Sequence, residues 1–343
     1  MGLGRRLYRG EIDVDFVGKW RLWYSLSGLL LAVSLAGILF NGLNLGVEFK
    51  GGTVFTFPAT SGTVEEVRED FRTQGAHQVI VQRARDNWRV TTETLTESTL
   101  NQMQTTIAKE YKVPVKDVSV QSIGASWGGE VSQKAWIGLG VFMLAIILYL
   151  SMAFEPKMAL SAIVALIHDL VITAGVYAWS GFEVTPATLL GFLTILGYSL
   201  YDAVVVFDMI KEVTAKLGTT SKMTYSMAAN NALNHTLIRS LNTSLVAILP
   251  VAAILFIGTT LLGAGTLKDL SLALFVGMIV GTYSSLCVAT PMLVTLKERE
   301  PKYQAIARRL ASTSGKGAKG SKSAAVAKGP SQSVAKGASP SGG

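Results

Sequence analysis

Six long apolar segments constrain the fold of this chain more than any other feature of its sequence. Each is about as long as the ~20 helical residues that cross a hydrocarbon core about 30 Å thick. They occupy residues 22–40, 135–154, 158–179, 187–207, 241–262 and 270–296. We therefore predict an α-helical integral membrane protein with six transmembrane helices.

The positions of the basic residues predict the orientation of the chain in a membrane. Basic side chains beside membrane spans favour the cytoplasmic side, and they gather in residues 1–21 and 297–343. We expect both termini to be cytoplasmic in a multi-pass plasma (inner) membrane protein, with a cytoplasmic loop at about 208–240. Topology and contact with the anionic headgroups of the lipid bilayer account for the net charge of +8, so we expect no specific nucleic-acid partner.

Residues 41–134 are numerous enough to form a small folded domain outside the membrane. The apolar patterns predict a ferredoxin-like α+β domain inserted between helices 1 and 2, with the order strand-helix-strand-strand-helix-strand. The expected strands are 51–59, 77–85, 87–96 and 113–124, and the expected helices are 63–75 and 97–112. At the other end of the chain, the basic, Ser/Gly/Ala/Lys-rich tail within 297–343 is predicted to be disordered, because it has too little apolar surface to bury.

One carboxylate, Asp202, interrupts the fourth apolar segment. An acid at that depth costs about 2.5–3.5 kcal/mol on insertion scales, and it marks an ion path, a salt bridge or a hydrogen-bonded packing feature. Arg239, at the entry of the fifth segment, is the partner that the sequence suggests. A proton on Asp202 would break such an ion pair and change helix packing; a static pair that only holds two helices together is the alternative.

His168 and Asp169 lie near the middle of the third apolar segment. A histidine beside an acid at this depth could relay protons, and hydrogen-bonded packing is the alternative. Because adjacent residues of a helix point about 100° apart, we do not expect these two side chains to pair. Asp208 lies about 240° around the helix from Asp202, so we expect it to be an interfacial residue.

Small residues in the sixth apolar segment predict close helix packing. Gly277 and Gly281 are four positions apart, and Ser284 and Ser285 follow them. This spacing lets a second helix approach closely. A sliding surface between moving helices is the alternative interpretation.

The sequence shows no arrangement typical of covalent catalysis. His77, His168 and His235 fall in different segments and do not have metal-ligand spacing, and Cys287 has no second cysteine to pair with. No GxxxxGK[ST] phosphate loop is present. We expect no enzyme activity, no cofactor and no metal, so an ion gradient or a partner protein must supply any energy that the chain uses.

Four ordered motifs resemble those of the SecF family of protein-export membrane proteins, which belongs to the resistance-nodulation-division superfamily. They are GLNLGVEFKGGTVF (42–55), GYSLYDAVVVFDMIKE (197–212), NHTLIRSLNTS (234–244) and GMIVGTYSSLCVATPML (277–293), and the resemblance covers about residues 10–300. The family-motif positions that we single out are Gly46, Glu48, Gly51, Gly52, Gly197, Tyr198, Asp208, Gly277 and Gly281.

The resemblance implies an accessory subunit of the Sec preprotein translocase. Such a subunit pairs with SecD, works beside the SecYEG channel and uses proton-motive force to promote export of the translocating preprotein; YajC and SecA are further implied partners. The resemblance also implies that Asp202 and Arg239 conduct protons, and the residues themselves make Asp169 and His168 second candidates. Where asparagine is common in the family this chain has Tyr201.

Three alternatives remain open at this point. A proton-coupled exporter of small molecules or lipids from the same superfamily would also need intramembrane acids. A structural scaffold for SecD would need none of them to change protonation. Sodium could replace the proton as the coupling ion, with oxygen ligands from Ser199, Thr194 or the backbone.

Overall fold

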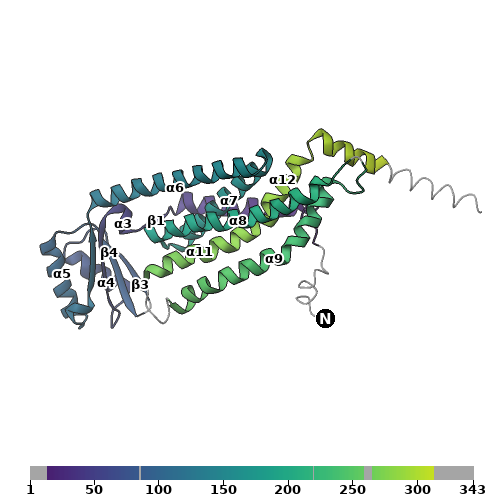
Figure 1. Ribbon diagram of the computed structural model, residues 1–343. Helices are drawn as coiled ribbons and strands as arrows, with labels where there is room; N and C mark the ends of the chain where they lie inside the picture. The colour runs from purple at the N-terminus through teal and green to yellow at the C-terminus, as the bar shows by residue number, and fades with distance from the viewer. Residues whose placement is uncertain (1–13, 85, 219, 259–264, 313–343) are drawn as a thin grey trace, which may run out of the picture.

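The computed structural model describes residues 14–84, 86–218, 220–258 and 265–312, and this part of the chain contains six helices long and apolar enough to span a membrane. Figure 1 shows them as one elongated bundle with a sheet domain at one end. They are α2 (Trp20–Phe40), α6 (Ala125–Ala153), α7 (Pro156–Ser180), α8 (Pro186–Ala215), α9 (Tyr225–Ala253, continued by the π-helical turn η2, Ile254–Gly258) and the unbroken series α11 (Gly265–Ser284), η3 (Ser285–Ala289) and α12 (Thr290–Lys297). The predicted six-helix membrane fold is confirmed.

Proline and threonine position the starts of the two most central helices. Pro156 is the first residue of α7 and Pro186 is the first residue of α8. Proline is favourable there because the N–H groups of the first turn have no partner within the helix, so the missing N–H of proline costs no hydrogen bond. Thr185 caps α8 by accepting a hydrogen bond from the Thr188 N–H, and the Thr188 hydroxyl bonds back to the Thr185 N–H. These caps place the acids of both helices at defined depths in the bundle.

Three helices are longer than their apolar runs. α6 begins at Ala125 rather than at 135. Most of the segment 208–240, predicted as a loop, is helical, because α8 continues to Ala215 and α9 begins at Tyr225. Apolarity marks only the part of a helix that hydrocarbon surrounds, whereas backbone hydrogen bonding continues into polar sequence. Asp208 and Arg239 therefore both lie within helices rather than in a connecting loop.

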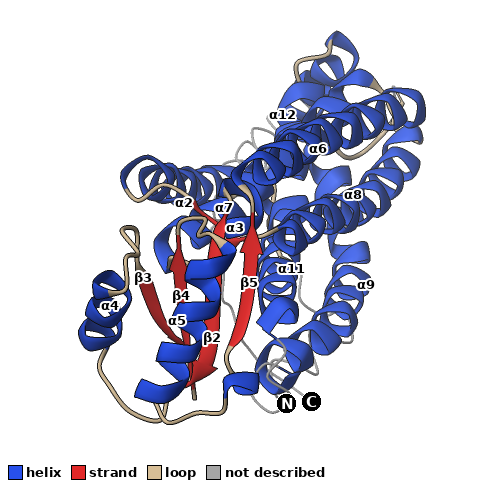
Figure 2. Cartoon of the chain, turned by 90° about the vertical axis from the view of Figure 1, so that its left-hand side faces the viewer, coloured by secondary structure: helices blue, strands red, loops and turns tan. Residues whose placement is uncertain are grey.

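The sheet domain has the predicted element order, with strands β2 (Gly52–Pro58), β3 (Ile80–Ala84), β4 (Asn87–Thr92) and β5 (Ser119–Ile123) and helices α4 (Val64–Thr73) and α5 (Glu97–Glu110). The strands lie in the order β3-β4-β2-β5, all antiparallel. The two helices pack on one face of the sheet (Figure 2), where Phe55, Phe57 and Trp88 meet Phe71 and Met103 in a buried core. The last strand begins later than predicted because residues Val115–Asp117 form a 3-10 turn.

A glycine pair joins the sheet domain to the bundle. Gly51 and Gly52 have φ angles of +75° and +143° between the short helix α3 (Val47–Lys50) and β2. A Cβ on Gly52 would lie 2.7 Å from the Thr92 carbonyl oxygen, and one on Gly128 of α6 would lie 2.6 Å from the Gly51 nitrogen. Only glycine permits this backbone conformation and this contact without strain.

Further contacts strengthen the same junction. The two-residue strand β1 (Asn44–Leu45) pairs in parallel with β6 (Glu183–Val184), which lies between α7 and α8. Arg89 on β4 forms an ion pair of 2.8 Å with Glu183. The carboxylate of Glu48 folds back over Gly46, and its Oε2 atom is buried without a hydrogen-bond partner among the described residues. The sheet domain is therefore attached directly to the start of α8.

The other end of the bundle, which we call the distal end, carries a cluster of ion pairs. Lys297 at the end of α12 contacts Glu155, and Lys157 lies 3.0 Å from Glu300. Residues 301–312, predicted as part of a disordered tail, are helical, and Tyr303 packs on Tyr225 with ring centroids 4.6 Å apart. This correction has a packing cause, since apolar residues of the segment are buried against α9. Residues 1–13 and 313–343, with the predicted basic N-terminus and most of the tail, lie outside the described residues.

Candidate functional site

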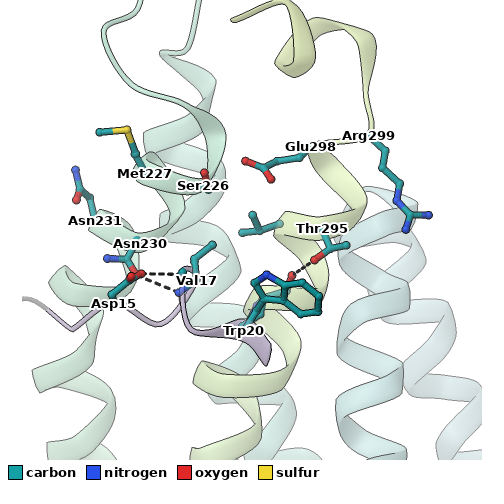
Figure 3. Close-up of a pocket in the computed structure, with 13 residues that line it drawn as sticks. Asp15, Val17, Trp20, Ser226, Met227, Asn230, Asn231, Thr295, Glu298 and Arg299 are labelled. Atoms are coloured by element: carbon teal, nitrogen blue, oxygen red, sulfur yellow. Dashed lines mark hydrogen bonds between the residues drawn. The ribbon is translucent and has the colours of Figure 1, made fainter. Parts of the chain in front are cut away.

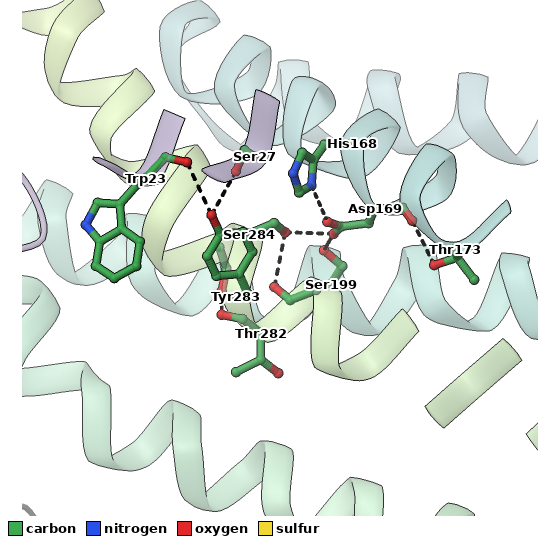
Figure 4. A network of polar contacts seen from close by, with 11 residues as sticks. Trp23, Ser27, His168, Asp169, Thr173, Ser199, Thr282, Tyr283 and Ser284 are labelled. Carbon is green, nitrogen blue, oxygen red and sulfur yellow. Dashed lines mark hydrogen bonds and ion pairs between the residues drawn. The ribbon is translucent and has the colours of Figure 1, made fainter. Parts of the chain in front are cut away.

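Asp169 on α7 lies fully buried at the centre of a polar network (Figure 4). The Ser199 hydroxyl of α8 donates to its carboxylate at 2.6 Å, and the Ser284 hydroxyl of α11 donates at 2.8 Å. His168 Nδ1 lies 3.0 Å from Asp169 Oδ1. The expectation that these neighbours cannot pair is wrong, because the two side chains turn toward each other despite the angle between their Cα–Cβ directions.

Asp202 on α8 is the second buried acid, with a relative exposure of 5%. The Ser240 hydroxyl of α9 donates to Asp202 Oδ1 at 2.5 Å, and the Ser285 hydroxyl of η3 donates to Oδ2. One carboxylate therefore joins three different membrane helices. Hydroxyl donors satisfy its oxygens, and they bring no positive charge with them.

Consecutive serines connect the two acids. Ser284 ends α11 and Ser285 begins the π-helical turn η3. Because adjacent helical residues point in different directions, one hydroxyl reaches Asp169 and the other reaches Asp202. π-Helical turns within α-helices are frequent at functional sites. The sequence analysis treated these serines only as small packing residues. Two consecutive serines in one span, with a buried acid in each of two other spans, could have indicated that the serines bond to the acids.

Arg239 does not form the predicted ion pair. Its side chain is exposed on α9, and among the described residues neither Asp169 nor Asp202 pairs with a lysine or arginine. The reason is helical geometry: Ser240 faces Asp202, so Arg239, about 100° around the helix, faces away.

Small residues hold the helices close enough for these bonds. A Cβ on Gly281 would lie 3.1 Å from Ser199 Cβ and 3.6 Å from Asp169 Oδ2. A Cβ on Gly277 would overlap Ile195 of α8. The close helix approach that the spacing predicted is present, and it brings the α11 hydroxyls within bonding distance of the acids on α7 and α8.

The remaining motif positions lie elsewhere. Tyr198 donates a 2.8 Å hydrogen bond to Ser244 of α9, beside the site. Asp208 is exposed further along α8, and a Cβ on Gly197 would meet no atom within 4 Å. The motif that holds Gly46, Glu48 and the glycine pair forms the junction with the sheet domain. The described ranges hold no group of three His, Cys, Asp or Glu residues that could bind a metal ion.

Comparison with known proteins agrees with these features. The family model of the protein export membrane protein SecD/SecF, C-terminal region, matches residues 102–299, and the SecD/SecF GG motif matches residues 36–62. The chain belongs to the SecD/SecF family. Together with the six apolar helices, this membership makes it a multi-pass membrane protein.

Several relatives of this SecD/SecF member have curated names. A protein translocase subunit SecF of Streptomyces coelicolor is 45% identical over 318 residues, covering 92% of this chain and 85% of that relative. Another, from Mycobacterium tuberculosis, is 42% identical over 306 residues, covering 86% and 69%. A protein translocase subunit SecDF of Thermus thermophilus is 33% identical, covering 85% of this chain and 40% of its own length.

A crystal structure of SecDF, described as a translocon-associated membrane protein from the same Thermus species, has the same fold. It superimposes with a TM-score of 0.77 at 31% identity and covers 87% of this chain. The match spans 42% of the SecDF chain, less than half of its length. The SecDF structure in a super-membrane-facing form gives a TM-score of 0.56.

Proposed function

We propose that this chain is an accessory subunit of the Sec preprotein translocase that pairs with a SecD partner and uses proton-motive force to promote protein export across the plasma membrane. The names of its relatives support this role, and a fused SecDF relative supports the pairing with SecD. SecYEG, SecA and YajC are the further partners that we propose. In this arrangement the distal end is cytoplasmic, the sheet domain is outside, and no covalent catalysis takes place.

One observation carries the mechanism: Asp202 is buried and bonded to hydroxyls from two other helices, without a countercharge in the described chain. A buried carboxylate is costly when ionised and can bind a proton from a path that reaches it. Serine hydroxyls can donate to the ionised form or accept from the protonated form by rotation about the Cβ–Oγ bond. The site is therefore compatible with both protonation states.

Protonation of Asp202 changes the hydrogen bonds that Ser240 and Ser285 can make with it. The ionised carboxylate accepts from both Ser240 and Ser285, whereas a protonated carboxyl donates through one oxygen, so one serine must become an acceptor or lose its bond. This exchange alters the contacts of α8 with α9 and η3. Because α8 begins at the junction that holds the sheet domain, a shift of α8 would move that domain against the preprotein. On the family resemblance, we also propose that Arg239 takes part in proton conduction. For Arg239 to contact Asp202, α9 would have to rotate about its axis.

The decisive experiment compares two aspartates of one helix. Asp202→Asn keeps size and polarity and removes the titratable proton, and Asp208→Asn makes the same change at an exposed position. Each variant is the only copy in the cell, at matched membrane level and with retention of the SecD partner verified, and export is followed by pulse-chase. We expect export in Asp202→Asn cells to fall to the rate of cells without the protein, while Asp208→Asn cells export normally. Normal export in Asp202→Asn cells would refute the proton role.

The same assay separates proton from sodium coupling. Export by inverted membrane vesicles can be driven by a proton gradient without sodium or by a sodium gradient under a protonophore. We expect only the proton gradient to stimulate export. Stimulation by sodium alone would assign the oxygen-rich Asp169 network to a sodium ion instead.

A further inference from the structure

Two hollows follow one another from the distal end of the bundle toward His168. The outer hollow, which we call the distal cleft, has a volume of about 680 Å³. Its polar and aromatic lining (Figure 3) includes Asp15, Trp20, Asn230, Thr295, Glu298 and Arg299. The inner hollow, which we call the His168 groove, has a volume of about 370 Å³. Its lining includes Tyr24, Ser27, Gly28, His168, Val288 and Met292.

The groove lies one helical turn deeper in the bundle than the cleft. Trp20 lines the cleft and Tyr24 the groove, four residues apart on α2. Thr295 lines the cleft and Met292 the groove, three residues apart on α12. Residues at these spacings lie on the same face of a helix, one above the other. The side chains of Tyr24, which lines the groove, and Thr295, which lines the cleft, contact each other, so this pair lies between the two hollows.

His168 borders this groove and has an unpaired ring nitrogen. Its ring is 3% exposed, its Nδ1 atom contacts Asp169, and its buried Nε2 atom has no partner among the described residues. Buried polar atoms in proteins are almost always hydrogen-bonded to protein or to water. The groove is much larger than the about 30 Å³ that one water occupies in the liquid. Most of its lining is apolar. Its polar groups are His168 and the hydroxyls of Tyr24 and Ser27, which already contact Thr295 and Tyr283 but can each take part in one more hydrogen bond to water.

We infer that the distal cleft and the His168 groove form a water-filled passage through which His168 exchanges protons between Asp169 and the distal side of the membrane. The inference rests on the proposed proton-coupled function and assigns it a route. In the exit direction, protonated Asp169 gives its proton to Nδ1 while Nε2–H releases a proton to groove water. The ring is neutral before and after the step. It returns to its starting tautomer by exchange with groove water, which protonates Nε2 and, once rotation has turned Nδ1 away from Asp169, takes the proton from Nδ1. Asp169, Tyr24, Tyr283 and Cys287 are the titratable groups around this ring and groove.

Thiol labelling tests whether the groove holds water. Gly28 is exposed, and a Cβ there would meet no atom within 4 Å, so Gly28→Cys fits without displacing a neighbour. Gly140→Cys on α6 is the matched control, because Gly140 is also exposed with open space around it. Both changes are made with Cys287→Ala in the full chain, co-expressed with its SecD partner. The probe is a charged, membrane-impermeant methanethiosulfonate, applied separately to right-side-out and inverted vesicles.

Reaction of a thiol with this probe needs water, because the thiolate is the reactive form. We expect Gly28→Cys to react at least about tenfold faster than Gly140→Cys, and only from the distal side. Equally slow reaction at both positions would mean that lipid fills the groove, and reaction from the sheet-domain side would place its opening elsewhere. Either result overturns the inference. Ser27→Cys repeats the measurement if the glycine variant fails to insert.

Export measurements test the relay. We expect His168→Gln, which cannot titrate, and Gly28→Leu, which fills the groove, each to lose the gradient-dependent part of export, while Gly140→Leu keeps it. Thermal unfolding of each variant with its partner checks that the effect is not a loss of folding. If Asp202→Asn stops export but His168→Gln and Gly28→Leu do not, the passage is wrong and the proposed function stands. If Asp202→Asn also exports normally, the proposed function itself fails.

Discussion

Ser285 donates a hydrogen bond to Asp202, and Ser284 beside it donates one to Asp169 at 2.8 Å. Two neighbouring residues of one helix therefore hold the buried acids of two other helices. Any shift of η3 that changes one of these bonds also moves the residue that makes the other. The sixth span is thus the mechanical link between the two acids.

Removal of one serine hydroxyl should destabilise the bundle. We expect Ser284→Ala to lower the free energy of unfolding by about 1.5–3 kcal/mol, because a buried carboxylate loses one of its donors. Ser151→Ala is the control, since the Ser151 hydroxyl is exposed and bonds only within its own helix. Denaturant unfolding in detergent measures both. A Ser284→Ala protein as stable as the control would show that Ser199 and His168 suffice to hold Asp169.

A methyl group between α8 and α11 should weaken the same network. We expect Gly281→Ala to destabilise the protein by about 1–3 kcal/mol and to slow export, because the new Cβ crowds Ser199 and pushes Ser284 away from Asp169. Gly140→Ala adds the same methyl in open space, so it should leave export unchanged and raise stability by about 0.5–1 kcal/mol through the higher helix propensity of alanine. Unfolding and pulse-chase export are measured on both variants. Equal stability and equal export of the two variants would mean that α8 and α11 can accommodate an extra methyl group at Gly281 without cost.

The Arg89–Glu183 ion pair should matter for both stability and coupling. The Arg89 side chain is 32% exposed but the Glu183 side chain only 10%, so Arg89→Glu places two carboxylates together at a mostly buried site and should cost about 1–3 kcal/mol in unfolding. If this pair transmits movement of the bundle to the sheet domain, export should slow several-fold. Adding Glu183→Arg restores the pair with exchanged charges and should recover export. Failure of the double variant to recover, with normal assembly, would remove this contact from the mechanism.

Glu93 in the sheet domain should make stability depend on pH. Burial alone would raise the pKa of this carboxyl, but hydrogen bonds from the His77 and Gln78 N–H groups outweigh it and hold the pKa below its ordinary value of 4.5. A lowered folded-state pKa means that the ionised form stabilises the fold above pH about 4.5, and that this contribution is lost as the pH falls through the folded-state pKa.

Comparison with Glu93→Gln isolates that contribution. We expect the full-length wild-type protein to have a higher Tm than Glu93→Gln at pH 6 and a smaller Tm advantage at pH 3.5, because the contribution of the carboxylate is lost progressively as the pH falls from about 4.5 through the lowered folded-state pKa. Thermal unfolding of both proteins at the two pH values, followed by calorimetry, measures this. A Tm difference that stays constant between the two pH values would contradict it.

The sequence by itself determined the membrane class, the six spans, the order of elements in the sheet domain and the identity of the buried acids. These properties follow from hydrophobic length, residue periodicity and the cost of charge in hydrocarbon, all of which are local to a segment. Helix ends were less well predicted, because polar residues continue α6 and α8 beyond their apolar runs.

Only the tertiary structure decided which side chains meet. Asp202 bonds to Ser240 and Ser285 rather than to Arg239, and Asp169 pairs with its own neighbour His168. These contacts depend on the rotation of each helix about its axis and on how closely glycines let the helices approach. Side chains of adjacent helical residues point about 100° apart. Which residue of one helix contacts a residue of another therefore depends on how the helices pack and not on position along the chain.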